Sequence, residues 1–440
     1  MKNNTRTEDN DSGYNTSFVT FLGGYFPESM TLAVLLSIIV LLGSLTSIKL
    51  LEALELFSTG FFNFLELQMS LILWWMLPAI VVESERTGII LDKITEKIPP
   101  KEKYIVLITF ILAFFLGWVN WAFGLITSIL VGQKLCIKAK NNGNKINYHI
   151  ILFISLLSLI SGNIGITSPG ALILTENYLE ITNISIINFA LNVQNLIIFS
   201  SMFLLLPLLY YHSTGKENKE ISERDLIINT SIKEKLKHHN IPPKDSWVPA
   251  DYLEYSSLLS IIAFLIGTTS ITWAWIHGNI TMLGILFAIL MLALISQKNP
   301  VAFMEKGADS TKWSLHLAIP FLLYAGTYSL LTKATLYTPI KNLLNGIPVI
   351  GSYLIALGAG ILIPDPGSLW FLLSPLSEVA GVLNSLITTM YAAGISNIWL
   401  GFIFIGILGI KGFNWKEYIE YALLTTVYLS IVIILVLTLI

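Results

Sequence analysis

The sequence has little charge. Only 12% of its 440 residues are Asp, Glu, Lys or Arg, whereas 54% are hydrophobic. A soluble globular domain carries about 25% charged residues, so the shortage predicts that much of the surface faces lipid. The formal net charge of −2 also lacks the basic excess that attracts nucleic acid. We therefore expect a lipid bilayer, and no nucleic acid, around this chain.

Cysteine and the common catalytic motifs are scarce as well. Cys136 is the single cysteine, which excludes an internal disulfide framework and a thiolate metal cluster. The sequence contains no HExxH zinc helix, no Walker GxxxxGK(S/T) loop and no GxSxG elbow. These absences argue against an enzyme and an ATP-driven pump. Residues 1–29 begin with a polar tail that lacks the apolar segment of a cleavable signal peptide.

Apolar segments dominate the rest of the chain. A bilayer core about 30 Å thick needs about 20 apolar residues per helical crossing. The segments that meet this test, or nearly do, are residues 30–46, 61–83, 105–132, 148–174, 186–211, 255–276, 280–296, 313–332, 349–380, 384–410 and 418–440.

Two of these segments, 105–132 and 349–380, are predicted to enter and leave the membrane on the same side. With that topology, 23 of the 26 Lys and Arg residues lie on one face of the membrane, which identifies that face as cytoplasmic. The N-terminus then lies in the cytoplasm, and nine helices cross the plasma membrane.

Helix-breaking residues support the two hairpins. Gly117, Asn120 and Gly124 lie in the middle of the first, and Pro364–Gly367 in the middle of the second. Such residues are tolerated at membrane depth where the backbone is buried in protein or lines a cavity. The alternative is a pair of kinked crossing helices.

The order of elements repeats along the chain. Residues 30–211 and 277–440 each contain a helix, an amphipathic connector, a helix, a hairpin and two further helices. A cytoplasmic linker, 212–254, and one extra crossing, 255–276, separate them, so the second half is expected to be inverted relative to the first. The predicted fold is an all-α polytopic membrane protein with two inverted repeats, an arrangement typical of secondary transporters.

The helix after each hairpin is predicted to be broken at mid-depth, in 148–174 at Ser161–Gly170 and in 384–410 at Ala392–Asn397. A break can leave backbone amides free to bind an anion and carbonyls free to bind a cation. The alternative is that these small residues serve helix packing.

The candidate ligands come from the hairpin tips and the breaks. Asp365, with Asn120 and Asn163, is the candidate site for a coupling sodium ion or proton, because a carboxylate at the bilayer centre is costly. Asp365 could instead cap the half-helix that begins near Gly367. No other cofactor is expected. The candidate substrate-binding residues are Asn120, Trp121, Gly124, Gly162, Asn163, Thr167, Ser168, Gly367, Ser368, Ser396 and Asn397.

Several stretches resemble the short-chain fatty acid transporters. VNWAFGL (Val119–Leu125) is similar to the hairpin tip of that family. Weaker similarities cover GFFNFLELQM (Gly60–Met69), KNPVAFM (Lys298–Met304) and PFLLYAG (Pro320–Gly326). The resemblance implies ion-driven transport of small monocarboxylates, a homodimer, and an elevator movement of the hairpins and broken helices against a scaffold.

The sequence departs from the family pattern at the predicted site. SGNIGITSP replaces a glycine run, IPDPGSLW lacks a family histidine and contains Asp365, and YAAGISN (Tyr391–Asn397) lacks a family glutamate. Two alternatives therefore stay open. The chain could carry another anion, a dicarboxylate or an amino acid, or it could be a receptor or assembly subunit that kept the fold without transport.

Overall fold

The chain is an all-α polytopic membrane protein, and the residues that the structure describes form no β-strand. The computed structural model describes residues 29–175, 184–213, 244–278, 281–297, 299–401 and 415–440. The N-terminal tail and most of the predicted linker lie outside these ranges. Six helices in the described ranges are long and apolar enough to cross a membrane. They are Leu65–Val82, Glu102–Val119, Trp121–Asn141, Val193–Ser213, Ser257–Ile276 and Tyr418–Leu439.

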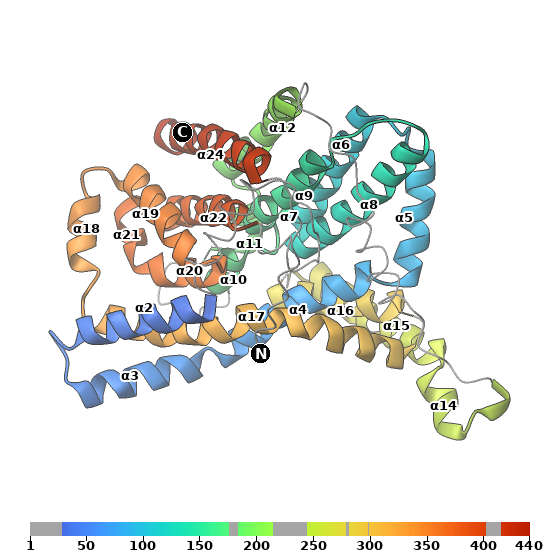
Figure 1. Cartoon of the computed structure of the whole chain (residues 1–440). Helices are drawn as coiled ribbons and strands as arrows, with labels where there is room; N and C mark the ends of the chain where they lie inside the picture. Colours follow the sequence, from blue (N-terminus) through green and yellow to red (C-terminus); the bar gives the residue numbers. More distant parts are fainter. Residues whose placement is uncertain (1–28, 176–183, 214–243, 279–280, 298, 402–414) are drawn as a thin grey trace, which may run out of the picture.

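The helices form two layers. Along the base of the view in Figure 1 lies a layer of long helices, which we call the long-helix layer. Its members are α2 (Ser29–Ser44), α3 (Leu50–Asn63), α4 (Leu65–Val82), α15 (Ser257–Ile276), α16 (Met282–Ser296) and α17 (Pro300–Lys333).

Above this layer lies a bundle made of both hairpins and the helices that follow them (Figure 1). We call it the hairpin bundle. Its first half contains α6 (Glu102–Ile111), a π-helical turn (Leu112–Leu116), α7 (Gly117–Val119), α8 (Trp121–Asn141), α9 (Tyr148–Asn163), α10 (Pro169–Thr175), α11 (Ile186–Ala190) and α12 (Val193–Ser213). Its second half contains α19 (Pro348–Leu362), α20 (Pro366–Leu373), a 3₁₀ turn (Ser374–Leu376), α21 (Ser377–Ala380), α22 (Val382–Trp399) and α24 (Trp415–Leu439).

The first predicted hairpin is confirmed as a reversal of the chain. The backbone leaves the helical conformation at Asn120, with φ −161° and ψ 130°, and α8 then returns along α6. A Cβ on Gly124 would lie 2.5 Å from the Cα of Gly117, and one on Gly132 would lie 3.4 Å from Oγ1 of Thr109. The arms touch because glycines lie between them.

The second hairpin reverses between α19 and α20, at Ile363–Asp365. Pro366 occupies the first turn of α20, where a missing N–H costs no helical hydrogen bond. On the returning arm, Leu369 approaches α19 closely, because a Cβ on Gly360 would lie 3.4 Å from its Cδ2. The Pro-Asp-Pro-Gly sequence therefore forms a hairpin tip and not a kink in a crossing helix.

The two predicted helix breaks have different outcomes. The break in 148–174 is present, because α9 ends at Asn163 and α10 begins at Pro169. The break predicted at Ala392–Asn397 is wrong, since α22 continues to Trp399. A Cβ on Gly394 would lie 2.9 Å from the Cα of Ile160, so the small residue there brings α22 close to α9. Helix packing, and not a break, explains this stretch.

A second correction concerns residues 297–333. The sequence predicts an amphipathic connector followed by a crossing at 313–332, but α17 is one helix of 34 residues. At 1.5 Å per residue it is about 50 Å long. Asn299 caps its start by accepting a hydrogen bond from the Ala302 amide at 2.8 Å, and Pro300 fits its first turn. The helix packs against α2, α3 and α4 and so runs the length of the long-helix layer.

The remaining connectors are short helices. The predicted crossing at 186–211 is interrupted between α11 and α12, while α15 and α16 agree with the predicted 255–276 and 280–296. Three linking helices are α5 (Glu85–Lys97), α14 (Pro249–Glu254) and α18 (Thr338–Leu344), and a 3₁₀ turn covers Lys244–Ser246.

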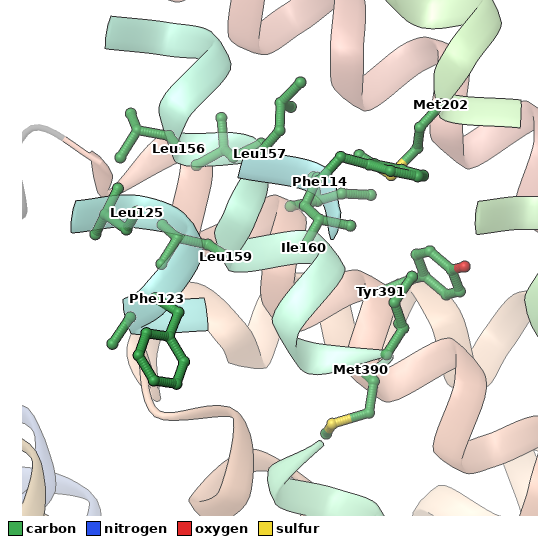
Figure 2. Close-up of a cluster of buried hydrophobic side chains, with 14 of the residues drawn as sticks. Phe114, Phe123, Leu125, Leu156, Leu157, Leu159, Ile160, Met202, Met390 and Tyr391 are labelled. Carbon is green, nitrogen blue, oxygen red and sulfur yellow. The ribbon is translucent and has the colours of Figure 1, made fainter. Parts of the chain in front are cut away.

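The core of the hairpin bundle is built around α9, whose residues are all buried. Figure 2 shows the side chains that surround it. Phe114 of the first hairpin stacks on Phe199 of α12, with ring centroids 3.9 Å apart. Met390 and Tyr391 belong to α22, which also packs on α9 (Figure 2). Both halves of the chain therefore meet on this helix.

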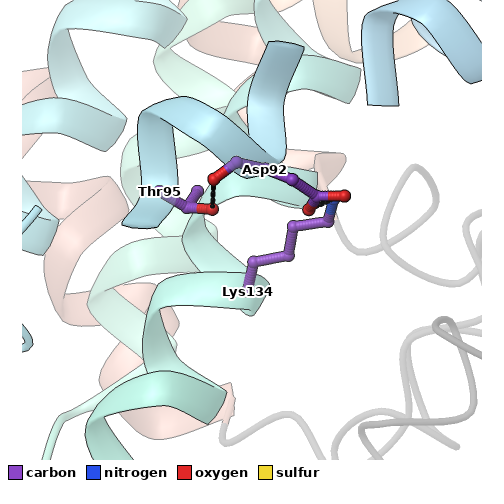
Figure 3. Close-up of polar contacts among 3 residues, drawn as sticks. All are labelled: Asp92, Thr95 and Lys134. Atoms are coloured by element: carbon purple, nitrogen blue, oxygen red, sulfur yellow. Dashed lines mark hydrogen bonds and ion pairs between the residues drawn. The ribbon is translucent and has the colours of Figure 1, made fainter. Parts of the chain in front are cut away.

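Ion pairs join α5 to the first hairpin. Lys134 of α8 pairs with Asp92 of α5, and the Thr95 hydroxyl donates to the Asp92 carbonyl at 2.9 Å (Figure 3). Lys138, one turn further along α8, donates to three carbonyls at the C-terminal end of α5. A lysine is well suited to this place because the last carbonyl groups of a helix have no N–H donor within the helix. The linking helix thus belongs to the hairpin bundle.

The two halves pack in a reciprocal pattern. Helix α2 packs on α17 while α16 packs on α4, and α4 contacts the first hairpin while α17 contacts the second. Lys341 of α18 pairs with Glu378 of α21 at 2.6 Å, as Lys134 pairs with Asp92 in the first half. These contacts support a repeated unit. The inverted relation of the repeats stays a prediction.

Candidate functional site

A cavity lies where the hairpin tips, the break after α9 and the long-helix layer meet. Its empty volume is about 630 Å³, a figure that includes the solvent at its open mouth. Both hairpin tips contribute, although they are more than 200 residues apart. The lining residues are Leu71, Trp74, Asn120, Trp121, Leu159, Asn163, Thr167, Pro169, Leu172, Pro364, Asp365, Pro366 and Asn397.

Asn120 fixes the first hairpin tip in two ways. Its Oδ1 accepts hydrogen bonds from the amides of Ala122 at 2.9 Å and Phe123 at 3.3 Å, so the side chain caps α8. Its Nδ2 donates to the carbonyl of Trp74 in α4 at 3.1 Å. In a continuous helix that carbonyl would accept from residue 78, but Pro78 has no N–H to give. The proline therefore leaves an acceptor for the hairpin tip.

Stacked indoles strengthen the same contact. Trp121 of the hairpin lies on Trp75 of α4, with ring centroids 4.7 Å apart and an interplanar angle of 27°. Behind the tip, a Cβ on Gly162 would lie only 2.3 Å from the Cβ of Trp121. Gly162 and Gly124 are thus packing residues that let the tip sit against its neighbours. Neither lines the cavity.

The break after α9 contributes Asn163 and Thr167. Asn163 is 3% exposed and donates from Nδ2 to the carbonyl of Met390 at 3.3 Å. The Oγ1 of Thr167 is buried and has no hydrogen-bond partner. Ser168 accepts from the Ala171 amide at 3.5 Å and lies outside the cavity lining.

Asn195 of α12 holds the broken end of α9 and is a residue that sequence reasoning missed. Its Nδ2 donates to the carbonyls of Ile164 at 3.0 Å and Phe189 at 3.1 Å. Its own carbonyl accepts from the Tyr391 hydroxyl at 3.1 Å. A buried asparagine inside an apolar crossing was the available signal. Asn195 therefore binds a carbonyl that the break leaves free.

Asp365 caps the returning arm of the second hairpin and also lines the cavity. Its Oδ2 accepts from the Ser368 amide at 2.6 Å, and the side chain is 9% exposed. The position of Asp365 is therefore compatible both with a cap for α20 and with a ligand for a coupling ion. Gly367 and Ser368 follow it inside α20 but do not line the cavity.

The predicted residues of α22 point in different directions. Asn397 lines the cavity, is 4% exposed, and has an Oδ1 without a hydrogen-bond partner. Ser396 instead donates to the carbonyl of Leu357 in α19 at 3.0 Å. A Cβ on Gly360 would lie 2.7 Å from its Oγ, so Ser396 belongs to the packing of α22 on the second hairpin.

The main-chain amides at the tips and the break were expected to be free for an anion, and several are occupied. The amides of Ala122, Phe123 and Ser368 bind their own capping side chains. The Ile166 amide donates to the carbonyl of Trp118 in the hairpin tip at 3.0 Å. Side chains, and not these amides, are the groups left to bind a ligand.

Among the residues that the structure describes, Asp365 is the one ionisable residue that lines the cavity, and no lysine or arginine does so. Among the described residues, no group of three His, Cys, Asp or Glu side chains is placed to hold a metal ion. A cation here would therefore be bound by Asp365 together with amide, hydroxyl or main-chain oxygens. Such hard oxygen ligands suit a sodium ion.

Of the predicted substrate residues, the cavity brings together Asn120, Trp121, Asn163, Thr167 and Asn397. It leaves out Gly124, Gly162, Ser168, Gly367, Ser368 and Ser396. The apolar lining was missed, above all Leu71 and Trp74 of α4. The placement of Pro78 four residues after Trp74 was the one local signal that the carbonyl of Trp74 is available.

Similarity to known proteins extends over nearly the whole chain, including both hairpins and the helices that line the cavity. The family described as short chain fatty acid transporter matches residues 14–440. A protein of Haemophilus influenzae with the provisional name short-chain fatty acid transporter is 22% identical over 324 residues, and the match covers 70% of each chain. No solved structure matches the chain.

Proposed function

Because the chain belongs to the short-chain fatty acid transporter family, we propose that it carries short-chain fatty acids or similar small monocarboxylates across the plasma membrane. It acts as an ion-coupled secondary transporter and has its N-terminus in the cytoplasm. The cavity between the hairpin tips is the substrate site. The observation that carries this proposal is the meeting of both tips, the broken helix and α4 around one cavity with a polar and an apolar lining.

The lining suits a monocarboxylate better than a dicarboxylate. A second carboxylate would call for a cationic group, and the described part of the chain places neither lysine nor arginine in the cavity lining. Asn163, Thr167 and Asn397 offer neutral polar groups for one carboxylate. Leu71, Leu159 and Leu172 offer apolar contact for a short chain.

Asp365 supports coupling to a cation. A substrate carboxylate and the Asp365 carboxylate would share one buried cavity, and two such charges repel each other strongly unless a proton or a metal ion lies between them. A sodium ion or a proton that enters with the substrate removes this repulsion. Coupling then follows because substrate binding is favourable only when the cation is present.

The two layers support an elevator movement. The hairpin bundle contains most of the cavity lining, whereas the long-helix layer contributes Leu71 and Trp74 on one side. Sliding of the bundle along this layer would expose the cavity to the other side of the membrane. Figure 1 shows how the long-helix layer runs beneath the bundle. We include a homodimer in the proposal, with the long-helix layer as the static scaffold.

Counterflow in proteoliposomes tests the function. Proteoliposomes that contain the purified protein are loaded with unlabelled butyrate. The entry of labelled acetate or butyrate is then followed with and without sodium, at two values of pH. We expect saturable counterflow that depends on one of the two cations. Asp365→Asn keeps an oxygen to cap α20 but loses the charge, and we expect its counterflow to lose that dependence on the cation.

Competition separates the alternatives. Counterflow of labelled succinate and of labelled amino acids is measured in the same way, with excess butyrate as the competitor. A carrier of either class would show counterflow of its own substrate, and butyrate would not inhibit that counterflow. A receptor or assembly subunit would show no counterflow of any anion. Either result would contradict the proposed function.

A further inference from the structure

We propose that Leu71 of α4 and Leu159 of α9 form an apolar wall that sets the longest acyl chain the transporter accepts. This inference rests on the proposed function and deepens it, because it assigns a specificity role to residues outside the polar part of the cavity. Neither leucine contacts the charged group of the substrate in this proposal.

The cavity has apolar side chains beside its polar groups. On α9, Leu159 lies one helical turn before Asn163, and both line the cavity. On α4, Leu71 lies three residues before Trp74 and on the same face, and both line the cavity. A carboxylate bound near Asn163 would therefore direct its hydrocarbon tail toward Leu159 and α4.

The wall belongs to both layers. Leu159 is 3% exposed and lies in the packed core of the hairpin bundle (Figure 2). Leu71 is half-buried and lies in the long-helix layer. The tail of the substrate would then lie between the layers, where one side of its cavity is formed by the static scaffold.

The distance between the polar groups and the wall is held by contacts of α4 with the hairpin tip. Asn120 donates to the Trp74 carbonyl at 3.1 Å, and Trp75 stacks on Trp121. Because these contacts hold α4 against the tip in this conformation, extra methylene groups on the substrate would have to displace Leu71 or Leu159. Protein interiors are close-packed, so such displacement is costly.

Truncation of the wall tests the inference. We would compare Leu71→Ala and Leu159→Ala with the wild type by counterflow of butyrate and of hexanoate, and would take the ratio of kcat/KM for the two acids. One methylene in an apolar pocket changes discrimination by about 10-fold to 200-fold, so we expect hexanoate to gain at least about tenfold over butyrate in each variant. The ratio is insensitive to the amount of folded protein.

Leu156→Ala is the matched control. Leu156 is a buried leucine of the same helix, close to Gly401 and not in the cavity lining. Its truncation removes the same atoms from the bundle, so the hexanoate-to-butyrate ratio should stay at the wild-type value. If an alanine variant fails to insert into the membrane, Leu159→Val enlarges the cavity by a smaller amount and should shift the ratio in the same direction.

The outcomes separate this inference from the proposed function. Wild-type counterflow with unchanged ratios in both wall variants overturns the inference and leaves the function standing. An equal shift in Leu156→Ala also overturns it, because the effect would then be a general loosening of the bundle. A wild type that carries no monocarboxylate overturns the function and this inference together.

Discussion

Gly162 illustrates how a glycine near the site serves the fold. Its hydrogen faces the hairpin tip at a place where a Cβ would be 2.3 Å from the Cβ of Trp121, and also closer than 3 Å to the backbone of that residue. Gly358 of α19 is the opposite case, because nothing lies within 4 Å of a Cβ there. Substituting each glycine by alanine therefore separates the effect of crowding, at Gly162, from the effect of reduced backbone flexibility, at Gly358.

We expect Gly162→Ala to destabilise the protein by about 1–3 kcal/mol, the usual cost of overpacking, and to reduce uptake by displacing Trp121. We expect Gly358→Ala to be neutral or to stabilise the helix by about 0.5–1 kcal/mol. Thermal unfolding in detergent and butyrate uptake would be measured for both. Equal effects of the two substitutions would show that the close contact at Gly162 has no energetic consequence.

Asn120 has two separable roles, and its substitutions should distinguish them. Asn120→Ala removes the cap of α8, worth about 1 kcal/mol, together with the donor to the Trp74 carbonyl, and we expect it to abolish uptake without loss of expression. Asn120→Asp keeps the capping oxygen but loses the donor. We therefore expect it to retain most of the stability and still to impair uptake. Full uptake by the alanine variant would remove Asn120 from the site.

At the scale of elements, α4 is shaped by Pro78. The proline leaves the Trp74 carbonyl without its helical donor, and the first hairpin supplies one through Asn120. The main-chain carbonyl of Trp74 therefore joins α4 of the long-helix layer to a tip of the hairpin bundle, next to the stacked Trp75 and Trp121. This contact is local in α4 but links residues 46 positions apart.

Pro78→Ala should weaken that link. The new N–H at position 78 can donate to the Trp74 carbonyl, so it competes with Asn120 for the acceptor. We expect faster hydrogen exchange of the backbone around residues 117–123 and a lower rate of uptake. Pro207→Ala, in the middle of α12, is the control for a proline in a helix. Unchanged hydrogen exchange at the hairpin tip would show that the bond from Asn120 to the Trp74 carbonyl does not stabilise the tip.

Helices α9 and α22 show why one predicted break is present and the other is not. Both contain small and polar residues at mid-length. After α9 the sequence continues to Thr167, Ser168 and Pro169, and proline disfavours helix in the residue before it. In α22 no proline follows Gly394, and close packing on Ile160 favours a continuous helix. Small residues alone do not distinguish a break from a packing face.

At the scale of the whole molecule, the proposed function requires the layers to move relative to each other. Phe64, between α3 and α4, packs edge-on against Phe371 of the second hairpin, with ring centroids 4.5 Å apart. A covalent bridge at this contact would hold the second hairpin to the long-helix layer.

We expect cysteines at positions 64 and 371, joined by a short thiol-reactive linker, to reduce butyrate uptake to about a tenth or less. A cleavable linker should allow reduction to restore uptake. Each single substitution, treated in the same way, is the control, and the native Cys136 is buried. Full uptake in the bridged protein would exclude sliding of the layers as the transport movement.

The sequence by itself determined the membrane environment, the reversal of the chain at both hairpin tips and the first break. Its low charge, its apolar segments and its helix-breaking residues act locally, so they can be recognised without knowing what lies next to them. Its candidates Asn120, Asn163, Thr167, Asp365 and Asn397 all line the cavity, whose role as the binding site stays a proposal. That each hairpin enters and leaves the membrane on one side stays a prediction.

Only the tertiary structure decided which groups remain available to a ligand. Asn120 and Asp365 bind amides of their own helices, and the Trp118 carbonyl takes another amide from the break. The structure also added Leu71 and Trp74 as a second wall of the cavity. These features depend on contacts between distant parts of the chain, and hydrogen-bond partners across layers leave no periodic pattern in the sequence.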